Sequence, residues 1–373
     1  MPLFSSVRVS QRFRKGKKFA KSMLKQYGRY EQWLLQPDSI GRFAYSTYSQ
    51  NGEDGIIAEI IKRLGLKELT FVEVGSSDGQ ENCTRLLLEN GSVGLWIEGD
   101  REKAVRAREL SPTISLEVVN EIIDCQNIMT VINNSTLVNS GFDLLVVDVD
   151  GNDWWLFKTI LVHYSPQVIV AEYNPAYGPK KKWVMPYNAL HTWKGDQNYG
   201  ASLSAYDELF QSNGYRLIAC DPSGTNGFWV KNEMANLFGE RRKRSGLFAQ
   251  APMQRMHPKV GVKVLNDYLN SNDLSRIDIP RIECIRSNHT TKFIVICEVS
   301  NQLEFSISSA GNFPIRLGLR SSTSKEPIRA SIVGSIDPGA RGLAFALLDY
   351  NEDFSEIGIV QEGVAWSEQW KTC

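Results

Sequence analysis

Residues 71–84, FVEVGSSDGQENCT, decide the fold of this 373-residue chain. A short apolar strand leads to Glu73, and a turn that contains Gly75 and Gly79 precedes a leucine-rich helical stretch. This order suits a nucleotide-like ligand, because glycines let the backbone approach it and a helix N-terminus offers free N–H donors. The spacing falls short of G-x-G-x-x-G, so the turn alone is equally compatible with a tight strand-to-helix connection in any α/β protein.

The sequence on both sides of this turn predicts an α/β fold. Apolar strands alternate with helical patterns, which indicates a mostly parallel, Rossmann-like sheet covered on both faces. A last pair of strands around a turn at 221–227 predicts an antiparallel hairpin that completes the sheet. The predicted parallel strands cover residues 70–74, 94–100, 114–119, 142–150 and 167–172.

Polar side chains end most of these strands. Ligands of such sheets bind outside the carboxyl ends of the strands, and buried acids are costly unless they have a function. The sequence therefore predicts a ligand site at this edge. The residues concerned are Glu73, Glu98, Asn120, Asp148, Asp150 and Glu172.

The charge of this edge indicates which ligand it holds. Glu98 follows the glycine turn by roughly 20 residues, where an acid accepts hydrogen bonds from ribose hydroxyls. A nicotinamide dinucleotide and S-adenosylmethionine (SAM) both carry such a ribose. Glu73 and Asp78 would repel a pyrophosphate but attract the amine and sulfonium of SAM, so the residues favour SAM.

Several blocks in the same order resemble FkbM-like SAM-dependent methyltransferases, over residues 45–235. The resemblance implies methyl transfer to a hydroxyl, often on a sugar or glycan. It also implies cofactor contacts at Gln50, Glu53, Glu73, Gly75, Ser76, Asp78, Gly79, Glu98, Asn120 and Asp148, with backbone N–H groups of Ser76 and Ser77 as donors. The blocks are YSQ at 48–50, GEDG at 52–55, FVEVG at 71–75, DG at 78–79, GLWIE at 94–98, NI at 127–128, DVDGND at 148–153, EYNP at 172–175, YGASL at 199–203 and GTNGF at 224–228.

Methyl transfer to oxygen is an in-line displacement that needs a group to take the hydroxyl proton. We expect Asp150, Glu172 or His191 in this catalytic role. His191 belongs to a long aromatic loop, where a lone histidine is also compatible with a structural or solvated residue. Asp153 is another acid of this region, and its place before a helix favours a capping role.

A metal ion is a second use for the same acids. Asp150, Glu172 and Asn174 would form an oxygen-rich set suited to Mg²⁺ or Mn²⁺, similar to metal-dependent O-methyltransferases.

The loop at 176–199 is long enough to be functional. With Tyr173 just before it, its aromatic residues Tyr187, Trp193 and Tyr199 would suit the apolar faces of sugar rings. Packing within the loop explains them equally well.

Composition divides the chain into four parts. We expect a basic N-terminal arm at 1–44, the methyltransferase-like domain at 45–235 and a helical linker at 236–275. Short β-rich runs spaced by turn residues predict an all-β sandwich as an accessory domain at 276–373. This last region is also similar in pattern to glycan-binding sandwiches of polysaccharide export systems.

The basic arm has nine cations and no acid in its first 30 residues, although the whole chain has zero net charge. Its apolar residues would line one side of a helix at an anionic membrane surface, or the arm would be a solvated, partly disordered extension. Gly16 weakens a continuous helix. Nucleic acid is not an expected partner, because the remainder of the chain is acidic.

The remaining composition predicts a cytoplasmic protein, peripheral to a membrane at most through this arm. Six scattered cysteines have no metal spacing and indicate free thiols in a reducing compartment. No apolar run reaches the length of a membrane span. A different class of function stays open, namely a Rossmann-like glycan-binding or scaffold protein that has lost catalysis.

Overall fold

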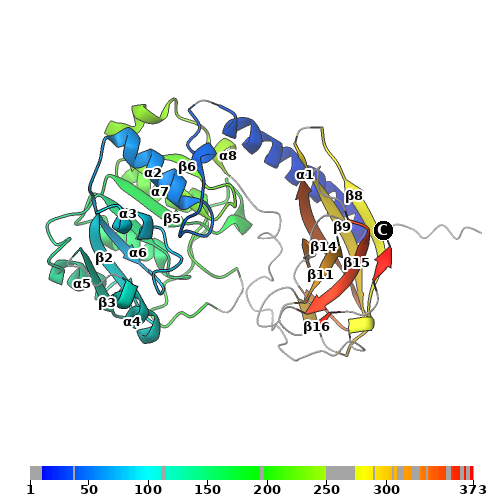
Figure 1. Ribbon diagram of the computed structural model, residues 1–373. Helices are drawn as coiled ribbons and strands as arrows, with labels where there is room; N and C mark the ends of the chain where they lie inside the picture. Colours follow the sequence, from blue (N-terminus) through cyan, green and yellow to red (C-terminus); the bar gives the residue numbers. More distant parts are fainter. Residues whose placement is uncertain are drawn as a thin grey trace, which may run out of the picture. The chain divides into compact units, whose positions relative to one another are not determined.

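The chain forms two compact units in the computed structural model (Figure 1). One unit comprises residues 32–193 and 198–250, and the other comprises residues 1–31, 194–197 and 251–373. The structure describes residues 11–36, 38–110, 115–193, 197–248, 274–288, 290–304, 306–308, 315–320, 328–332, 335–349, 354–361, 365–366 and 370–372.

The first unit, which we call the α/β unit, is built on a seven-stranded sheet of order β3-β2-β1-β4-β5-β7-β6. The first five strands pair in parallel, and β7 pairs antiparallel with both β5 and β6. The predicted Rossmann-like sheet with its antiparallel hairpin is therefore confirmed. The strands are β1 Thr70–Val74, β2 Val93–Glu98, β3 Leu116–Asn120, β4 Leu144–Val147, β5 Val168–Glu172, β6 Tyr215–Cys220 and β7 Asn226–Lys231.

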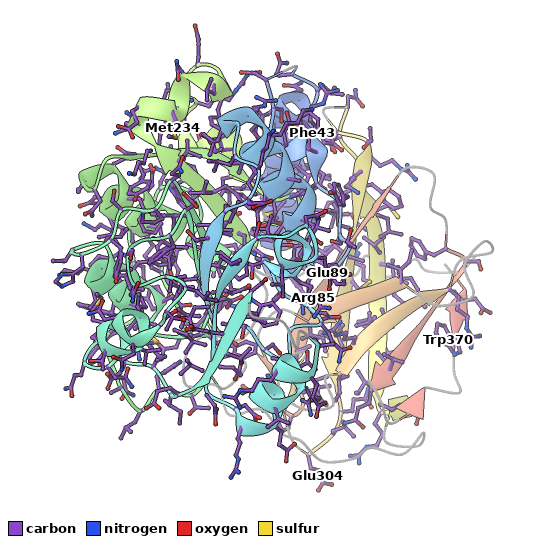
Figure 2. All side chains as sticks on the ribbon, turned by 60° about the vertical axis from the view of Figure 1, so that its left-hand side comes forward. Phe43, Arg85, Glu89, Met234, Glu304 and Trp370 are labelled. Carbon is purple, nitrogen blue, oxygen red and sulfur yellow. The ribbon has the colours of Figure 1, made fainter. Side chains whose placement is uncertain are left out.

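Helices flank this sheet (Figure 1), and their burial pattern explains why the strands are apolar throughout. Every residue of β4 is buried, because both faces of the central strands are covered. The short helix α3 after the glycine turn gains support from an i,i+4 ion pair of Arg85 with Glu89, whose side chains lie together in Figure 2. The helices are α2 Glu53–Leu64, α3 Arg85–Glu89, α4 Arg101–Leu110, α5 Ile128–Asn134, α6 Asp153–Ile160, α7 Leu203–Ser212 and α8 Arg244–Leu247, with 3₁₀ turns η1 Gly41–Phe43, η2 Pro175–Tyr177 and η3 Asn232–Phe238.

The second unit, which we call the β unit, contains an eight-stranded antiparallel sheet and a two-stranded sheet, which confirms the predicted C-terminal β domain. Strands β9 and β14 pair over nine residues in the larger sheet. The strands are β8 Ile277–Ile285, β9 Lys292–Asn301, β10 Ile307–Ser308, β11 Ile315–Arg320, β12 Ile328–Ile332, β13 Ser335–Ile336, β14 Arg341–Asp349, β15 Glu356–Gln361, β16 Ala365–Trp366 and β17 Lys371–Thr372.

Helix α1, Gln11–Leu34, corrects the expectation of a solvated, partly disordered arm. Its apolar residues Phe13, Met23 and Leu24 are buried against the β unit, in a cluster that includes Ile294 and Phe345. An ion pair of Lys17 with Glu283 adds to this contact. The helix is stable because its apolar side is covered by protein, so that side is not available to a membrane.

Gly16 is the reason that this helix approaches the sheet so closely. A Cβ atom at this position would lie 2.7 Å from Leu343 Cδ1 and 2.8 Å from Ile296 Cδ1. The glycine that weakens the helix locally therefore permits its packing.

Alternate residues of β9 belong to two different apolar clusters. In β9, Val295 and Cys297 belong to the main core of the β unit, whereas Ile294 and Ile296 contact α1. Both faces of this strand are buried, which explains its continuous apolar sequence.

The expected linker at 236–275 is described only in part. Residues 236–248 contain the end of η3 and the four-residue helix α8. Residues 249–273 lie outside the described residues. Across the parts of the chain that are described, no helix has the length and apolar character needed to span a membrane.

Candidate functional site

A cavity of about 810 Å³ opens at the carboxyl edge of the seven-stranded sheet. Its walls include the ends of β1, β2, β4 and β5, as expected for a ligand site in such a fold. Its basic side chains are Lys103 and His191, so its lining is strongly acidic. The nine carboxylates of the lining belong to Glu53, Glu73, Asp78, Glu81, Glu98, Glu121, Asp148, Asp150 and Glu172.

Gly75 sets the floor of this cavity where β1 meets β4. Its φ angle is 86°, and a Cβ atom would lie 1.7 Å from the carbonyl oxygen of Asp148. Only glycine combines this backbone conformation with this close approach. Gly79 (φ 75°) similarly leaves room for the ring of Trp96, 2.5 Å from the place of its missing Cβ.

The backbone N–H groups of Ser76 and Ser77, expected to contact the cofactor, bond to the protein itself. Those of Gly75 and Ser76 donate to the carbonyl of Ile97 at 2.8 and 3.3 Å. That of Ser77 donates to Glu98 Oε2 at 2.8 Å. These donors are therefore occupied by the backbone of β2 and by the carboxylate of Glu98. Ser76 and Gly79 are absent from the cavity wall.

Glu73 is a buried acid that holds the segment between the turn and α3. Its carboxylate accepts hydrogen bonds from the N–H groups of Cys83 and Thr84 at 2.9 and 3.1 Å, and from the Thr84 hydroxyl at 2.5 Å. Burial raises the pKa of Glu73 to about 7, despite these bonds, which lower it. The N–H donors ahead of α3 are thus occupied by a carboxylate, which leaves no cradle for a pyrophosphate at this turn.

Glu98 ends β2 and lines the cavity. Its oxygens accept from Ser77 N at 2.8 Å and from Asp100 N at 2.7 Å, which fixes the carboxylate and leaves lone pairs for further donors. Asn120 does not reach the cavity wall. Its amide group donates to the carbonyls of Glu98 and Gly99 at 2.8 and 3.1 Å, so it braces the backbone behind Glu98.

Gln50, Glu53 and Asp78 all line the cavity. Glu53 is buried and accepts from the amide of Asn226 at 2.7 Å, which links the start of α2 to the hairpin. Gln50 donates to Glu81 at 2.7 Å. Asp78 lies 3.4 Å from Arg106.

Three acids at the ends of β4 and β5 form the centre of the site. One carboxylate oxygen from each of Asp148, Asp150 and Glu172 lies within 4.8 Å of the others. Partial removal from water raises the pKa of all three, and for Asp148 and Glu172 the neighbouring carboxylates raise it further. Because the Asp148 side chain is exposed to the open cavity, we attribute its raised pKa chiefly to the neighbouring negative charges.

Asn174, expected beside these acids, is fully buried elsewhere. Its side chain accepts from Ala176 N at 3.2 Å and donates to the carbonyl of Tyr199 at 3.2 Å, so it shapes the loop that follows β5. Asp148 takes the place in the acidic group that the sequence suggested for Asn174.

Two residues of the cavity wall have strained backbones. Ser77 and Asp150 have φ angles of 54° and 51°, and they are the non-glycine residues with positive φ in the described part of the chain. Strain of this kind is typical of functional sites, where the surrounding structure enforces it.

His191 reaches the cavity from the long loop after β5. Its ring lies over Gly151, where a Cβ atom would be 2.5 Å from His191 Cδ2, and its Nε2 atom is buried without a hydrogen-bond partner. Two hydrogen bonds between Asn152 and Asn188, of 2.8 and 3.1 Å, hold this loop against the end of β4. The structure therefore brings His191 to the acidic group.

Asp153, by contrast, is not part of the cavity wall. Its carboxylate accepts from Val149 N at 2.7 Å and Gly151 N at 2.8 Å, and burial raises its pKa to about 6. It fixes the loop that presents Asp150.

Sequence reasoning missed several lining residues. Lys103 comes from the charged helix α4, and Glu121 directly follows β3. Asn226 depends on a turn in which Asp221 accepts from the N–H groups of Gly224 and Thr225 at 2.8 and 3.0 Å. The sequence signal that could have identified Asn226 is the polar turn at 221–226 between two apolar strands.

The proposed aromatic platform loses one member. Tyr173 is fully buried and packs against Phe248, with ring centroids 5.6 Å apart. Tyr187 and Trp193 remain 39% and 43% exposed, and Tyr199 lies edge-on to Trp193.

Comparison with known proteins gives a limited result. No protein-family model and no curated protein matches the chain. Among solved structures it is similar to a SAM-dependent methyltransferase from Mesorhizobium loti, with 15% identity over 48% of this chain and 100% of the other, at a TM-score of 0.31. It is also similar to the N-terminal domain of EvdMO1 with S-adenosylhomocysteine and D-fucose, with 13% identity over 58% of this chain and 95% of the other, at a TM-score of 0.32. A third similar structure is the mitomycin 7-O-methyltransferase MmcR, with 14% identity over 59% of this chain and 57% of the other, at a TM-score of 0.29. Similarity this low transfers no substrate to this chain, so the function is inferred from the site.

Proposed function

We propose that this chain is a SAM-dependent O-methyltransferase. The observation that supports the proposal best is the acidic cavity at the carboxyl edge of a Rossmann-like sheet. A ligand with a ribose and two cationic groups suits this lining, whereas a pyrophosphate would meet nine carboxylates.

The residues of the cavity fit SAM by their chemistry. Glu98, fixed by two backbone donors, would accept from the ribose hydroxyls. Glu53, Asp78 and Glu81 would attract the ammonium group, together with Gln50 as a neutral hydrogen-bonding partner. When bound, SAM supplies an electrophilic methyl group.

The acids at the ends of β4 and β5 would serve the acceptor. A hydroxyl that attacks a methyl group has to lose its proton, and Asp150, Glu172 and His191 are positioned side chains that can take it. Raised pKa values at Asp150 and Glu172 bring these carboxylates closer to the range in which general bases work near neutral pH.

A divalent metal ion would be an alternative use of the same group. Mg²⁺ or Mn²⁺ prefers oxygen ligands, and Asp148, Asp150 and Glu172 offer three carboxylates whose mutual repulsion a cation would relieve. Asn174 is not among these ligands, because its side chain is occupied in the loop. Activity that survives exhaustive chelation would exclude an essential metal ion.

For the acceptor we propose a hydroxyl of a sugar or glycan. The exposed rings of Tyr187 and Trp193 lie in the loop that also carries His191, and such rings can stack on a pyranose. We also propose that the β unit helps to present this acceptor.

For the location of the protein we propose the cytoplasm. We further propose that it contacts anionic membrane surfaces through the cations of α1.

Calorimetry with the purified chain tests the cofactor. We expect heat of binding with SAM and S-adenosylhomocysteine, and about tenfold or weaker binding for Glu98→Gln, which loses a charge-assisted acceptor. The matched control is Glu109→Gln, an exposed acid of α4 that does not line the cavity. Binding of NAD without binding of SAM would refute the proposal.

Radiolabelled SAM and a panel of sugars and glycans test the reaction. We expect Asp150→Asn and Glu172→Gln to retain SAM binding and to lower methyl transfer by about 10²-fold or more, as loss of a general base does. If the wild-type chain binds a glycan and transfers no methyl group to it, the chain is a binding or scaffold protein with an inactive Rossmann-like domain.

A further inference from the structure

The α/β unit contains a second cavity, of about 440 Å³, that shares no lining residue with the acidic one. Its charge is opposite, because it has six cations and a single acid, Asp207. We call it the basic cavity. Its cations are Lys180, Arg216, Arg241, Arg242, Lys243 and Arg244.

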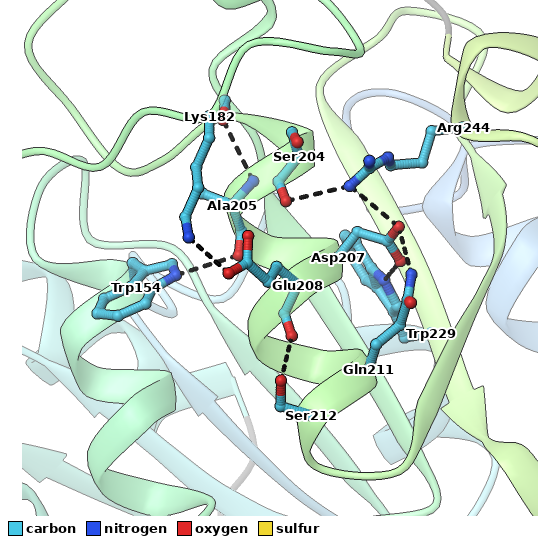
Figure 3. Close-up of polar contacts among 11 residues, drawn as sticks. Trp154, Lys182, Ser204, Ala205, Asp207, Glu208, Gln211, Ser212, Trp229 and Arg244 are labelled. Atoms are coloured by element: carbon cyan, nitrogen blue, oxygen red, sulfur yellow. Dashed lines mark hydrogen bonds and ion pairs between the residues drawn. The ribbon is translucent and has the colours of Figure 1, made fainter.

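Two basic runs that are far apart in sequence meet here. Residues 180–182 read KKK, and residues 241–244 read RRKR. Figure 3 shows the contacts that hold the second run near α7: Arg244 lies 3.3 Å from Asp207 and donates to the carbonyl of Ser204 at 3.2 Å. Asp207 also accepts from Gln211 at 2.6 Å and Trp229 at 3.3 Å, so the one acid of the cavity is fully engaged by the protein.

Three of the six cations have structural partners. Arg244 is held by Asp207, Arg242 lies 3.1 Å from Asp38, and Arg216 donates to the carbonyl of Gly239 at 2.9 Å. These bonds fix the wall of the cavity and leave part of each guanidinium free, because a guanidinium has five donors.

The other three cations have no carboxylate within ion-pair distance among the residues that the structure describes. Lys180, Arg241 and Lys243 are all exposed at the mouth of the cavity. Burial lowers the pKa of Arg216, and the nearby positive charge of Arg241 lowers it further. An uncompensated group of cations around a concave surface is unfavourable when empty and favourable once an anion neutralises it.

We infer that the basic cavity binds the phosphate groups of a small phosphorylated molecule, with at least two negative charges. Arginine forks match phosphate oxygens in a bidentate geometry, and the lysines add point charges. The volume suits a small ligand. A nucleic acid is less well matched, because the cations form one concave cluster instead of a track along an extended backbone. The inference does not depend on methyl transfer.

Calorimetry of the full chain with inorganic pyrophosphate, at about 0.15 M salt, tests this site. We expect saturable binding, weaker binding of inorganic phosphate, and at least about tenfold loss of pyrophosphate affinity in Arg241→Gln/Lys243→Gln. Both side chains are exposed, so the variant should keep its thermal unfolding temperature. The matched control is Lys62→Gln/Lys67→Gln, which removes two exposed cations of the same unit outside the cavity.

Distinct results would overturn the inference. One is that the wild-type chain does not bind pyrophosphate. The other is that the control variant loses as much affinity for pyrophosphate as Arg241→Gln/Lys243→Gln, which would show a general effect of charge. Vesicles of phosphatidylglycerol and a single-stranded oligonucleotide complete the experiment. Binding of either one that depends on Arg241 and Lys243 but is not displaced by pyrophosphate would assign the surface to a membrane or a nucleic acid instead.

Discussion

At the scale of single residues, the site depends on a glycine that no other residue can replace. Gly75 has a positive φ angle and lies against the Asp148 carbonyl, so a side chain there would separate β1 from β4. We expect Gly75→Ala to destabilise the chain by more than the about 1–2 kcal/mol that the left-handed conformation alone costs. Urea unfolding measures this difference.

Gly91→Ala is the control for that experiment. Gly91 has a similar φ angle of 91°, but nothing lies within 4 Å of its missing Cβ. Gly91→Ala should therefore lower the free energy of unfolding only by the cost of the left-handed backbone conformation. Equal losses of stability in the two variants would mean that the contact with Asp148 does not constrain the site.

The buried acids near the cavity predict a pH dependence of stability. Folding raises the pKa of Glu73 and of Asp221 to about 7, from ordinary values near 4, so the folded state binds more protons between these limits. The contribution of Glu73 and Asp221 to the free energy of unfolding is fully present below pH 4 and is lost as pH rises to about 7. We therefore expect urea unfolding to show lower stability at pH 8 than at pH 5.

Glu73→Gln should be less stable at both pH values, because its amide N–H group would face the donors of Cys83 and Thr84. It should also show a smaller difference between the two pH values. A wild-type stability that rises from pH 5 to pH 8 would contradict the raised pKa values of Glu73 and Asp221.

At the scale of helices and strands, the sequence was sufficient for the sheet and insufficient for α1. Strands buried on both faces are apolar throughout, and that signal is local. The apolar residues of α1 are sparse among cations, and their partners Ile294 and Phe345 lie more than 250 residues away. No local pattern could show that protein covers them.

The candidate site was also predictable only in part: the acids at the strand ends were identified, and the directions of the side chains beyond them were not. Acids at strand ends were identified because parallel strands end at one edge, so Asp148, Asp150 and Glu172 meet as expected. The direction of a side chain beyond the strand end is set by loop hydrogen bonds, which the sequence does not reveal. Asn174 and Asn120 accordingly bind backbone groups instead of facing the cavity.

Packing of α1 gives a test at this scale. We expect Gly16→Val to destabilise the β unit by about 1–3 kcal/mol, as overpacking does, because the side chain would press on Leu343 and Ile296. Ser22→Val is the control, since Ser22 is exposed on the same helix. If thermal unfolding shows the same effect for both variants, the close approach at Gly16 is not important.

At the scale of the whole molecule, charge is separated although the net charge is zero. The exposed side of α1 carries cations spaced along one helical stripe, and its apolar side is covered. We therefore expect salt-sensitive binding to anionic vesicles without insertion into the bilayer. Each cation near the membrane surface should contribute about 1 kcal/mol to the free energy of binding. The stripe comprises Arg14, Lys18, Lys21 and Lys25.

Cosedimentation with vesicles measures this binding. Replacement of the four stripe residues by glutamine should abolish it, and raised salt should weaken it. Vesicles of neutral lipid are the control. Binding that persists in the variant or at high salt would show that another surface, or apolar insertion, is responsible.

The packing of α1 on β9 and β14 also has a consequence for biosynthesis. Helix α1 leaves the ribosome before β9 and β14, the strands that shelter its apolar side. Closing this contact spans most of the polypeptide, which makes it a slow, late step, and Phe13, Met23 and Leu24 stay uncovered until then. Until β9 and β14 have been made, the nascent chain therefore carries an exposed amphipathic segment that is prone to aggregation.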